Sequence, residues 1–198
     1  MTEDELHDLA DTALRVLDPR YGPTFRACIL FAGYVGLRPA ELFRLKRTDI
    51  EGDEVGIRRS LGNTGEVTLP KNGKTRTVIL PPPARLALRE MPTVATSPYL
   101  FNTVRGKPLS KSSHYYYWNT VRAACGRPGM DFYELRHFCA THLLELGATP
   151  WDVAIQLGHT DGGTLVTSTY GHPSEKAARD RLLEAYGERV TALRVVSE

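Results

Sequence analysis

The sequence is poor in the features that mark several classes of protein. It holds 3 cysteines in 198 residues, widely spaced and without a CxxC motif, which argues against a disulfide scaffold and predicts reduced thiols. No apolar run approaches the ~18 residues of a membrane span. The acidic start MTEDELHD is unlike a signal peptide. We therefore expect a soluble cytoplasmic protein with no membrane partner.

The chain also lacks a large excess of charge of either sign. Its 25 Lys and Arg against 23 Asp and Glu give a net charge of +2, and its 41% of hydrophobic residues argues against disordered, collagen-like and coiled-coil chains. The distribution is uneven, because residues 56–127 carry +10 whereas residues 1–55 and 128–172 carry −4 each. Such a basic block favours a surface that faces a polyanion, and the alternative is an ordinary solvated surface.

A chain of this length is expected to form one compact domain, because ~70% of the unfolded surface is buried at this size. Within residues 1–198 we expect a core over about 1–172 and a C-terminal helix and tail over 173–198. Thr2 and Glu5 have capping-box spacing, and the apolar residues behind them predict a first helix over 3–17. Further helices are predicted between Pro23 and Gly36, from Pro39, after the prolines 81–83, and over 111–124, 134–146, 150–158 and 175–186.

The segment 54–80 has a different pattern. Apolar and polar residues alternate with a period of two in EVGIRRS, GEVTLPK and KTRTVIL, as in half-buried strands. Asn72-Gly73 lies between the last two runs and favours a two-residue hairpin turn. We therefore predict a hairpin with Lys71 and Lys74 beside its tip. The predicted fold is mainly α with a small antiparallel β-sheet (α+β).

Two arginines stand at positions where anions can bind. Arg38 lies in the corner GLRPAEL between two predicted helices, where it can be directed at a ligand or be paired with Glu41. Arg136 lies in the first turn of the helix over 134–146, and both a helix N-terminus and a guanidinium attract phosphate. Each arginine is therefore a candidate phosphate ligand, with a structural role as the alternative.

Three further features could carry chemistry or contact a nucleic acid. His159 follows a glycine, so its ring can project from a tight turn or be structural, and Tyr170 can be a nucleophile or part of the core. The aromatic run 114–118 could contact sugars or bases, but on a helix we expect about half of it to fill the core. The remaining candidates, predicted as phosphate contacts, are Arg105, Lys107 and Lys111.

These segments follow one another in a fixed order: GLRPAEL, a hairpin with KNGK, YELRH, LGH and a tyrosine. In this order and spacing the chain resembles the catalytic domain of the tyrosine recombinases, the phage integrase family of site-specific DNA recombinases. GLRPAELFRLKRTDI is similar to the first arginine motif and LPKNGKTRTVIL to the lysine hairpin. The third similar segment, which covers the second arginine, the histidine and the nucleophile, is YELRHFCATHLLELGATPWDVAIQLGHTDGGTLVTSTYGH.

The resemblance covers about residues 2–186 and implies the tyrosine recombinase catalytic-domain fold. It implies an enzyme that cuts and rejoins double-stranded DNA through a 3′-phosphotyrosine intermediate. The general acid that it implies is Lys71, with Lys74 as the competing choice. The other roles that it implies are the phosphate clamp for Arg38 and Arg136, a further phosphate contact for His159, and the nucleophile for Tyr170.

At one position the chain departs from the family pattern. The family usually has histidine three residues before the second arginine, and Tyr133 stands there in this chain, followed by Glu134 where aspartate is commoner. A phenol with a pKa of ~10 is a poor general base at pH 7. We therefore expect Tyr133 to hydrogen-bond the phosphate or the nucleophile. The gap from His159 to Tyr170 is slightly long, which predicts a longer turn before the nucleophile helix.

The resemblance also implies partners. In relatives a separate N-terminal helical domain grips the opposite face of the duplex, and we expect that domain to be absent from this chain. The chain alone should then bind DNA weakly and in a salt-sensitive way. A homotetramer on DNA is implied, with a monomer in isolation. The helix predicted over 175–186 either covers its own domain or packs onto a neighbouring protomer.

We expect neither a metal nor another cofactor. The acidic cluster DIEGDE over 49–54 lacks the glycine that a calcium loop needs at its sixth position, and His137 and His142 do not have HExxH spacing. Breaking a phosphodiester bond requires stabilisation of charge on the nonbridging oxygens, for which many enzymes use Mg²⁺. Two arginines and a histidine in a partly dry site can supply that positive charge instead.

Two other functions stay open from the residues alone. One is a DNA-binding homologue that keeps the fold without the chemistry, and Tyr133 is the argument for it. The other is a type IB topoisomerase-like strand transferase, which shares the chemistry but relaxes supercoiled DNA without site preference.

Overall fold

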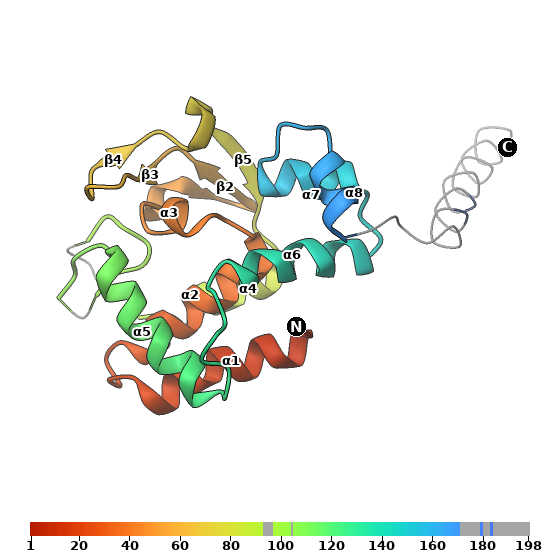
Figure 1. The fold of residues 1–198 in the computed structure, drawn as a ribbon. Helices are drawn as coiled ribbons and strands as arrows, with labels where there is room; N and C mark the ends of the chain where they lie inside the picture. The colour runs from red at the N-terminus through yellow and green to blue at the C-terminus, as the bar shows by residue number, and fades with distance from the viewer. Residues whose placement is uncertain (93–96, 104, 171–178, 180–182, 184–198) are drawn as a thin grey trace, which may run out of the picture.

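The computed structural model describes residues 1–92, 97–103, 105–170, 179 and 183. In Figure 1 the strands lie above the crossing of helices α2 and α6, with α1 below it and α7 and α8 at the side. The predicted class, mainly α with a small antiparallel sheet, is confirmed. The helices of the described part are α1 (Glu3–Val16), α2 (Gly22–Val35), α3 (Pro39–Leu42), α4 (Pro82–Glu90), α5 (Lys111–Ala124), α6 (Glu134–Glu145), α7 (Pro150–Leu157) and α8 (Thr164–Tyr170).

Local capping explains where the helices begin and end. Thr2 accepts a hydrogen bond from the backbone N–H of Glu5, and Glu5 accepts one from Thr2, so the predicted capping box opens α1. None of the described helices is long and apolar enough to cross a membrane.

The helix predicted over 175–186 falls on residues that, apart from 179 and 183, lie outside the described part.

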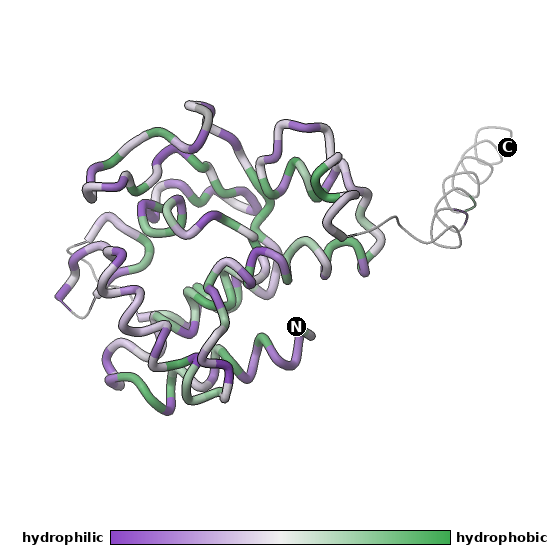
Figure 2. Tube along the Cα trace, in the orientation of Figure 1, coloured by the Kyte–Doolittle hydropathy of each residue, from purple (hydrophilic) through white to green (hydrophobic). Residues whose placement is uncertain are grey.

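Helix α2 forms the centre of the main core. Nearly all of its side chains are buried, because it packs against α1, α4 and α6. In Figure 2 its trace is green along most of its length, whereas α1 alternates between green and purple, as an amphipathic helix does. On α5 the aromatic run divides as predicted, since His114 and Trp118 are buried while Tyr115 and Tyr116 are exposed.

Two small antiparallel sheets pack beside this core. The first has the strand order β1 (Ile50–Glu51), β2 (Glu54–Ile57), β5 (Arg76–Ile79), and the second pairs β3 (Ser60–Leu61) with β4 (Val67–Thr68). The 3-10 turn η1 (Arg47–Asp49) leads into β1, and η2 (Lys71–Gly73) leads from β4 to β5. Val55 of β2 lies opposite Val78 of β5, and both side chains are buried.

The predicted hairpin at Asn72-Gly73 is wrong. β4 and β5, which flank this dipeptide, belong to different sheets, and the dipeptide lies in the turn η2, where Gly73 has φ +67°. The reason is burial: Val78 brings a buried face that pairs β5 with β2, while both residues of β4 are exposed and offer β5 no such face. Tertiary packing therefore overrides the local turn preference.

Two buried polar side chains join separate segments. The Arg44 guanidinium donates to the carbonyl oxygens of Gly65 (3.2 Å), between β3 and β4, and of Leu109 (3.0 Å), just before α5. The Gln156 carboxamide of α7 accepts from the backbone N–H of Ile79 (2.9 Å) and donates to its carbonyl oxygen (3.0 Å). Arg44 thus fixes the spacing of α3 and α5, and Gln156 attaches α7 to the edge of β5.

Candidate active site

Arg38 stands at a rigid corner between α2 and α3. Gly36 ends α2 in the left-handed conformation, at φ +73°, which residues with a side chain rarely adopt. Arg38 then begins α3, where its backbone N–H donates to Glu41 Oε2 (3.1 Å) and its carbonyl oxygen accepts from the Glu41 N–H (2.9 Å). The corner therefore fixes the backbone from which the Arg38 side chain extends.

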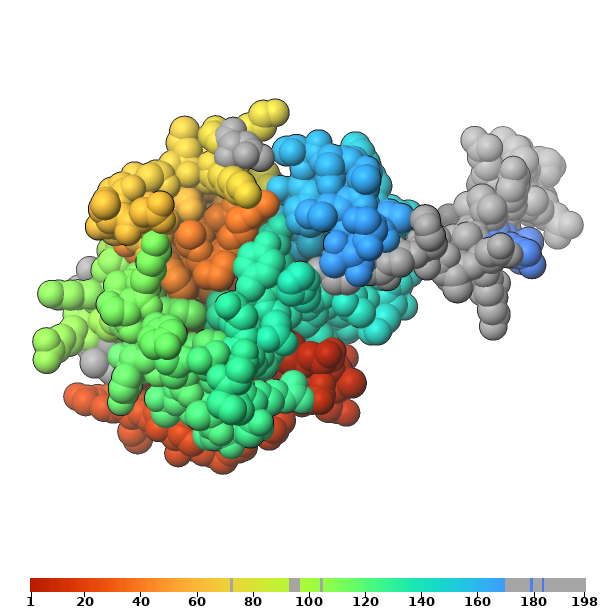
Figure 3. Space-filling model, in the orientation of Figure 1, coloured from red at the N-terminus to blue at the C-terminus, as the bar shows by residue number. Residues whose placement is uncertain are grey.

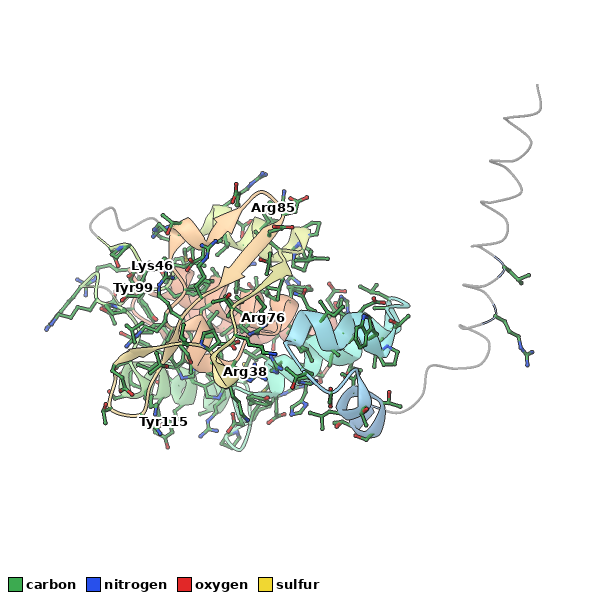
Figure 4. The ribbon with its side chains drawn as sticks, turned by 90° about the horizontal axis from the view of Figure 1, so that it is seen from above. Arg38, Lys46, Arg76, Arg85, Tyr99 and Tyr115 are labelled. Carbon is green, nitrogen blue, oxygen red and sulfur yellow. The ribbon has the colours of Figure 1, made fainter. Side chains whose placement is uncertain are left out.

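Glu41 is a buried carboxylate that two guanidinium groups share. Arg76 of β5 donates to both of its oxygens at 2.8 Å, and Arg38 donates to Oε1 at 3.2 Å. Burial alone would raise the pKa of Glu41, but the hydrogen bonds and charge of Arg76, together with Arg38, lower it below its ordinary value. Glu41 therefore stays ionised at neutral pH. Figure 4 shows Arg38 and Arg76 close together near the centre of the molecule.

Arg136 of α6 lies behind this pair and is only 2% exposed. It donates to the carbonyl oxygens of Gly36 (2.7 Å) and Leu157 (2.8 Å), each two residues before a candidate site residue. Burial, with the nearby charge of Arg38, lowers the pKa of Arg136 to about 10, so the guanidinium stays protonated at pH 7. Arg136 thereby joins the corner of Arg38 to the end of α7.

His159 follows the left-handed cap Gly158 of α7, at φ +71°. Its Nε2 lies 2.9 Å from Nη2 of Arg136, and since a guanidinium can only donate, Nε2 accepts and the proton of the neutral ring sits on Nδ1. Burial lowers the pKa of His159, and the charge of Arg136 lowers it further. His159 is therefore a neutral ring at pH 7, and its buried Nδ1 has no hydrogen-bond partner among the described residues.

Tyr133 and Tyr170 lie at the ends of two helices next to this cluster. Tyr133 precedes α6, and its ring centroid is 5.9 Å from the guanidinium carbon of Arg136. Tyr170 is the last residue of α8, and its side chain lies outside the described part. Helix α8 packs against α6 and α7, which position Arg136 and His159, through a small core that includes Val166. The backbone of Tyr170 is thus held on the same group of helices.

Arg38 and Arg136 both reach the turn that carries His159, whereas the two lysines lie in an exposed segment before β5. Arg38 Nη2 lies 3.4 Å from the carbonyl oxygen of Gly158, which places it beside the His159 turn. Lys71 begins the exposed turn η2 and Lys74 follows it.

Arg76 is the residue of this cluster that the sequence reasoning missed. A usable signal was present in the period-two run KTRTVIL, because Arg76 and Val78 share one face of β5 and Val78 is buried. An arginine on that face needs a carboxylate, and Glu41 faces the same core. The cluster therefore has three guanidinium groups around one carboxylate, which leaves a local excess of positive charge while His159 is neutral.

This arrangement is suited to binding an anion with several oxygens. Guanidinium groups donate paired hydrogen bonds to phosphate, and in a partly buried site each bond is stronger than in water. Across the described residues, no group of three or more His, Cys, Asp or Glu side chains could hold a metal ion. It is the excess of guanidinium donors over carboxylate acceptors that suits the site to a phosphate or a similar oxyanion.

Solved structures of similar fold include a transposon integrase and a recombinase. The Tn1549 transposon integrase, in complex with transposon right-end DNA, matches with a TM-score of 0.70 and 18% identity over 94% of this chain and 65% of that chain. The XerA recombinase matches with a TM-score of 0.64 and 24% identity over 93% of this chain and 64% of that chain. The class that these likenesses define is the tyrosine recombinase fold.

Sequence relatives narrow the class to a family. The integrase of Mycobacterium phage D29 is 31% identical over 150 residues, which are 69% of this chain and 40% of that protein. The tyrosine recombinase XerA of Pyrococcus furiosus is 30% identical over 191 residues, which are 93% of this chain and 62% of that protein. The phage integrase family model matches residues 1–177, and the chain belongs to this family. It spans less than half the length of the mycobacterial phage and prophage integrases that it matches.

Proposed function

We propose that this chain is the catalytic domain of a site-specific tyrosine recombinase, which cuts and rejoins DNA through a 3′-phosphotyrosine intermediate. The observation that carries the proposal is the meeting of Arg38, Arg136 and His159, which come from distant parts of the chain. Residues 1–172 are then the catalytic body, and residues 173–198 are a helix and tail. Membership of the phage integrase family supports this assignment.

In this mechanism the cluster binds the nonbridging oxygens of the DNA phosphate to be cut. Arg38 and Arg136 donate to these oxygens, and His159 donates to the same phosphate through Nδ1. Negative charge on the oxygens grows as the five-coordinate transition state forms, so these donors lower its energy more than that of the ground state. Arg76 and Glu41 act through Arg38, whose guanidinium they keep in place.

Tyr170 supplies the nucleophile. Its phenolic oxygen forms a bond to phosphorus while the bond from phosphorus to the 5′ oxygen breaks. The phenolic proton passes to solvent, and the 5′ oxygen receives a proton from Lys71 or, as the competing choice, Lys74. We propose that Tyr133 hydrogen-bonds the phosphate or the nucleophile. The phosphotyrosine keeps the bond energy, so a 5′ hydroxyl of another strand can reverse the step without ATP.

Covalent trapping tests this proposal. The substrate is a pool of nicked duplexes with randomised sequence next to the nick. Cleavage close to the nick releases a short fragment that carries the free 5′ hydroxyl. Because this fragment diffuses away, the step cannot reverse and the protein stays attached to the DNA. We expect a covalent adduct on a denaturing gel with the unmodified chain and none with Tyr170→Phe. Tyr116→Phe, which removes an exposed hydroxyl on α5, is the matched control and should keep the adduct.

Each outcome of the trapping has a meaning. An adduct that persists in Tyr170→Phe would contradict the assignment of the nucleophile. Absence of any adduct, also from a longer protein that contains this chain, would support a DNA-binding homologue without chemistry. Efficient relaxation of supercoiled DNA of arbitrary sequence would favour a topoisomerase-like enzyme.

The partners belong to the same proposal. We infer that the substrate is double-stranded DNA, that the chain is a monomer in isolation, and that four copies assemble on DNA in the cytoplasm. Relatives of similar fold are solved as complexes with DNA, which supports the substrate. An amphipathic segment over 175–186 that packs onto a neighbouring copy would couple the sites of the tetramer.

A further inference from the structure

A cavity of about 400 Å³ opens between α3 and α5 and shares Arg38 with the candidate active site. Figure 3 shows this face, on which the orange atoms around α3 lie between α5 (green), the strands (yellow) and α7 (blue). Arg38 and Tyr115, both part of the lining, are labelled in Figure 4. The phosphate mechanism uses only Arg38 of this lining, so the rest of the cavity has no role in it.

The walls of the cavity are rings that are already fixed in place. Phe43, Trp118 and Phe132 are all buried, and the His114 ring lies between Phe43 and Phe132, with centroid distances of 4.6 and 4.3 Å. Arg44 holds α3 at a set distance from α5 through its bonds to Gly65 and Leu109, so the space does not depend on a ligand to form. Aromatic walls of this kind suit a flat ring.

Two residues of the lining each carry a buried polar atom without a hydrogen-bond partner in the described part of the chain. Asn119 Oδ1 and His114 Nε2 are buried, and neither has a hydrogen bond among the described residues. Burial lowers the pKa of His114 to about 4, so this ring is neutral at pH 7. Buried polar atoms are nearly always paired, and a nucleobase edge carries both donors and acceptors that can pair with them.

The rim of the cavity is positively charged. Arg38, Lys111 and Arg122 contribute to the lining against one carboxylate, that of Asp131, which already accepts from the Tyr133 N–H at 2.7 Å. Lys111 donates to Asn63 and Arg122 to the carbonyl oxygen of Met130, and both keep further N–H groups for a ligand. An aromatic pocket with a cationic rim is complementary to a nucleotide, whose base is flat and whose phosphates are anionic.

We propose that this cavity binds one nucleotide of the cut strand with its base turned out of the duplex, while Arg38 holds the neighbouring phosphate. The proposal rests on the proposed function and deepens it. Strands can be exchanged only if the bases next to the break leave their first partners, and unpairing is unfavourable by itself. A pocket that binds the unpaired base stabilises this state where the chemistry needs it.

Tryptophan fluorescence tests the pocket without any cleavage. The chain has 2 tryptophans, Trp118 in the wall and Trp151, which is 58% exposed on α7, so Trp151→Phe leaves Trp118 as the reporter. We expect thymidine 3′,5′-bisphosphate to quench Trp118 saturably, and the abasic deoxyribose 3′,5′-bisphosphate to bind at least tenfold more weakly. In that background Asn119→Leu should weaken thymidine bisphosphate binding about tenfold.

A second experiment, with duplex DNA, tests whether the base leaves the duplex when the protein binds. A nicked duplex with a mismatched base beside the nick should bind about tenfold more tightly than its fully paired form. That gain should vanish in Asn119→Leu and in Asn119→Asp, which keeps the side-chain shape, and should persist in Glu145→Gln, an exposed change on α6. Unchanged thermal unfolding of the variants shows that they fold.

Equal binding of the abasic compound, no saturable quenching, or no gain from the mismatch would overturn the proposal. Because the adduct formed by Tyr170 is measured separately, a failure of the pocket can be told apart from a failure of the recombinase function. An adduct without nucleotide binding would contradict the pocket proposal and support the recombinase proposal. Nucleotide binding without an adduct supports the pocket and counts against the enzyme.

Discussion

Glu41 is the carboxylate around which the arginines of the candidate site are arranged. It receives three side-chain hydrogen bonds from Arg38 and Arg76, and the Arg136 guanidinium lies behind them. Without its charge, the guanidinium groups would repel one another in a partly buried space. Glu41 therefore stabilises the fold and sets the geometry of Arg38 at the same time.

Glu41→Gln keeps the size of the side chain and removes its charge. We expect the free energy of unfolding at neutral pH to fall by about 3–5 kcal/mol, as for other buried ion pairs that lose one partner. Because the folded-state pKa of Glu41 lies below its ordinary 4.5, its contribution is present at neutral pH and is lost as the pH falls below that value. Urea denaturation as a function of pH measures both effects.

The control for this change is Glu145→Gln, on the exposed side of α6. It should leave the free energy of unfolding within about 0.5 kcal/mol of the unmodified chain. Two results would contradict the role of Glu41 as the charge that holds the arginines together. One is that Glu41→Gln changes the free energy of unfolding as little as Glu145→Gln does. The other is that Glu41→Gln loses as much stability in acid as the unmodified chain.

The sequence predicts the site residues unequally. Arg38, Arg136 and His159 were identified through the resemblance to a family, and the structure brings them together. Nothing local in the sequence brings residues so far apart to one place, so motif order was the necessary information. For Arg76 the period-two run indicates only that the side chain shares a face with buried Val78, and its partner Glu41, on another element, has no local signature.

At the scale of elements, the position of His159 depends on the cap of α7. Gly158 takes φ +71°, and an added Cβ there would collide with the Arg76 guanidinium. Gly147, at the end of α6, has φ +93° but open space around it. Both glycines have a left-handed backbone, but only at Gly158 would an added side chain also collide with a neighbour. Comparing the two positions therefore distinguishes the effect of the backbone from the effect of the collision.

Gly158→Ala should therefore be more harmful than Gly147→Ala. Both changes should reduce the free energy of unfolding by about 1–2 kcal/mol through the left-handed backbone. Only Gly158→Ala should also displace Arg76 and His159, and we expect it to lower the rate of adduct formation by about 10²-fold or more, as for a lost oxyanion donor. Denaturation and single-turnover trapping of both variants provide the comparison, and equal trapping rates would contradict it.

Elements were predictable where their own residues decide them. The capping box of α1 and the bounds of α6 follow from local sequence, and the structure agrees within one or two residues. The hairpin at Asn72-Gly73 was not predictable in this way, because the choice between β2 and β4 as partner of β5 depends on which strand buries its side chains. That information lies in the packed molecule.

At the scale of the whole molecule, the basic block over 56–127 should govern DNA binding. Each phosphate that a Lys or Arg neutralises releases counterions, so log affinity should fall against log salt with a slope of about −0.9 per contact. We expect Lys107→Gln, an exposed change in this block, to make the slope shallower by about 1. Fluorescence anisotropy with a duplex of arbitrary sequence measures the slope.

Glu145→Gln lies outside the block and serves as the control, since it should leave the slope unchanged. Tight binding that survives high salt would contradict the expectation that the chain alone binds weakly. It would mean that apolar or base-specific contacts, rather than phosphate neutralisation, dominate the interaction.

The carboxamide of Gln156 occupies hydrogen-bonding groups on the free edge of β5. An unpaired strand edge is a template on which strands of other molecules can grow, and copies gathered on one DNA would meet at high local concentration. By offering a donor and an acceptor to Ile79 as a neighbouring strand would, Gln156 caps the outer border of the three-stranded sheet. An added strand therefore finds this position of β5 already occupied, so the association of copies that the proposed function requires is left to other surfaces.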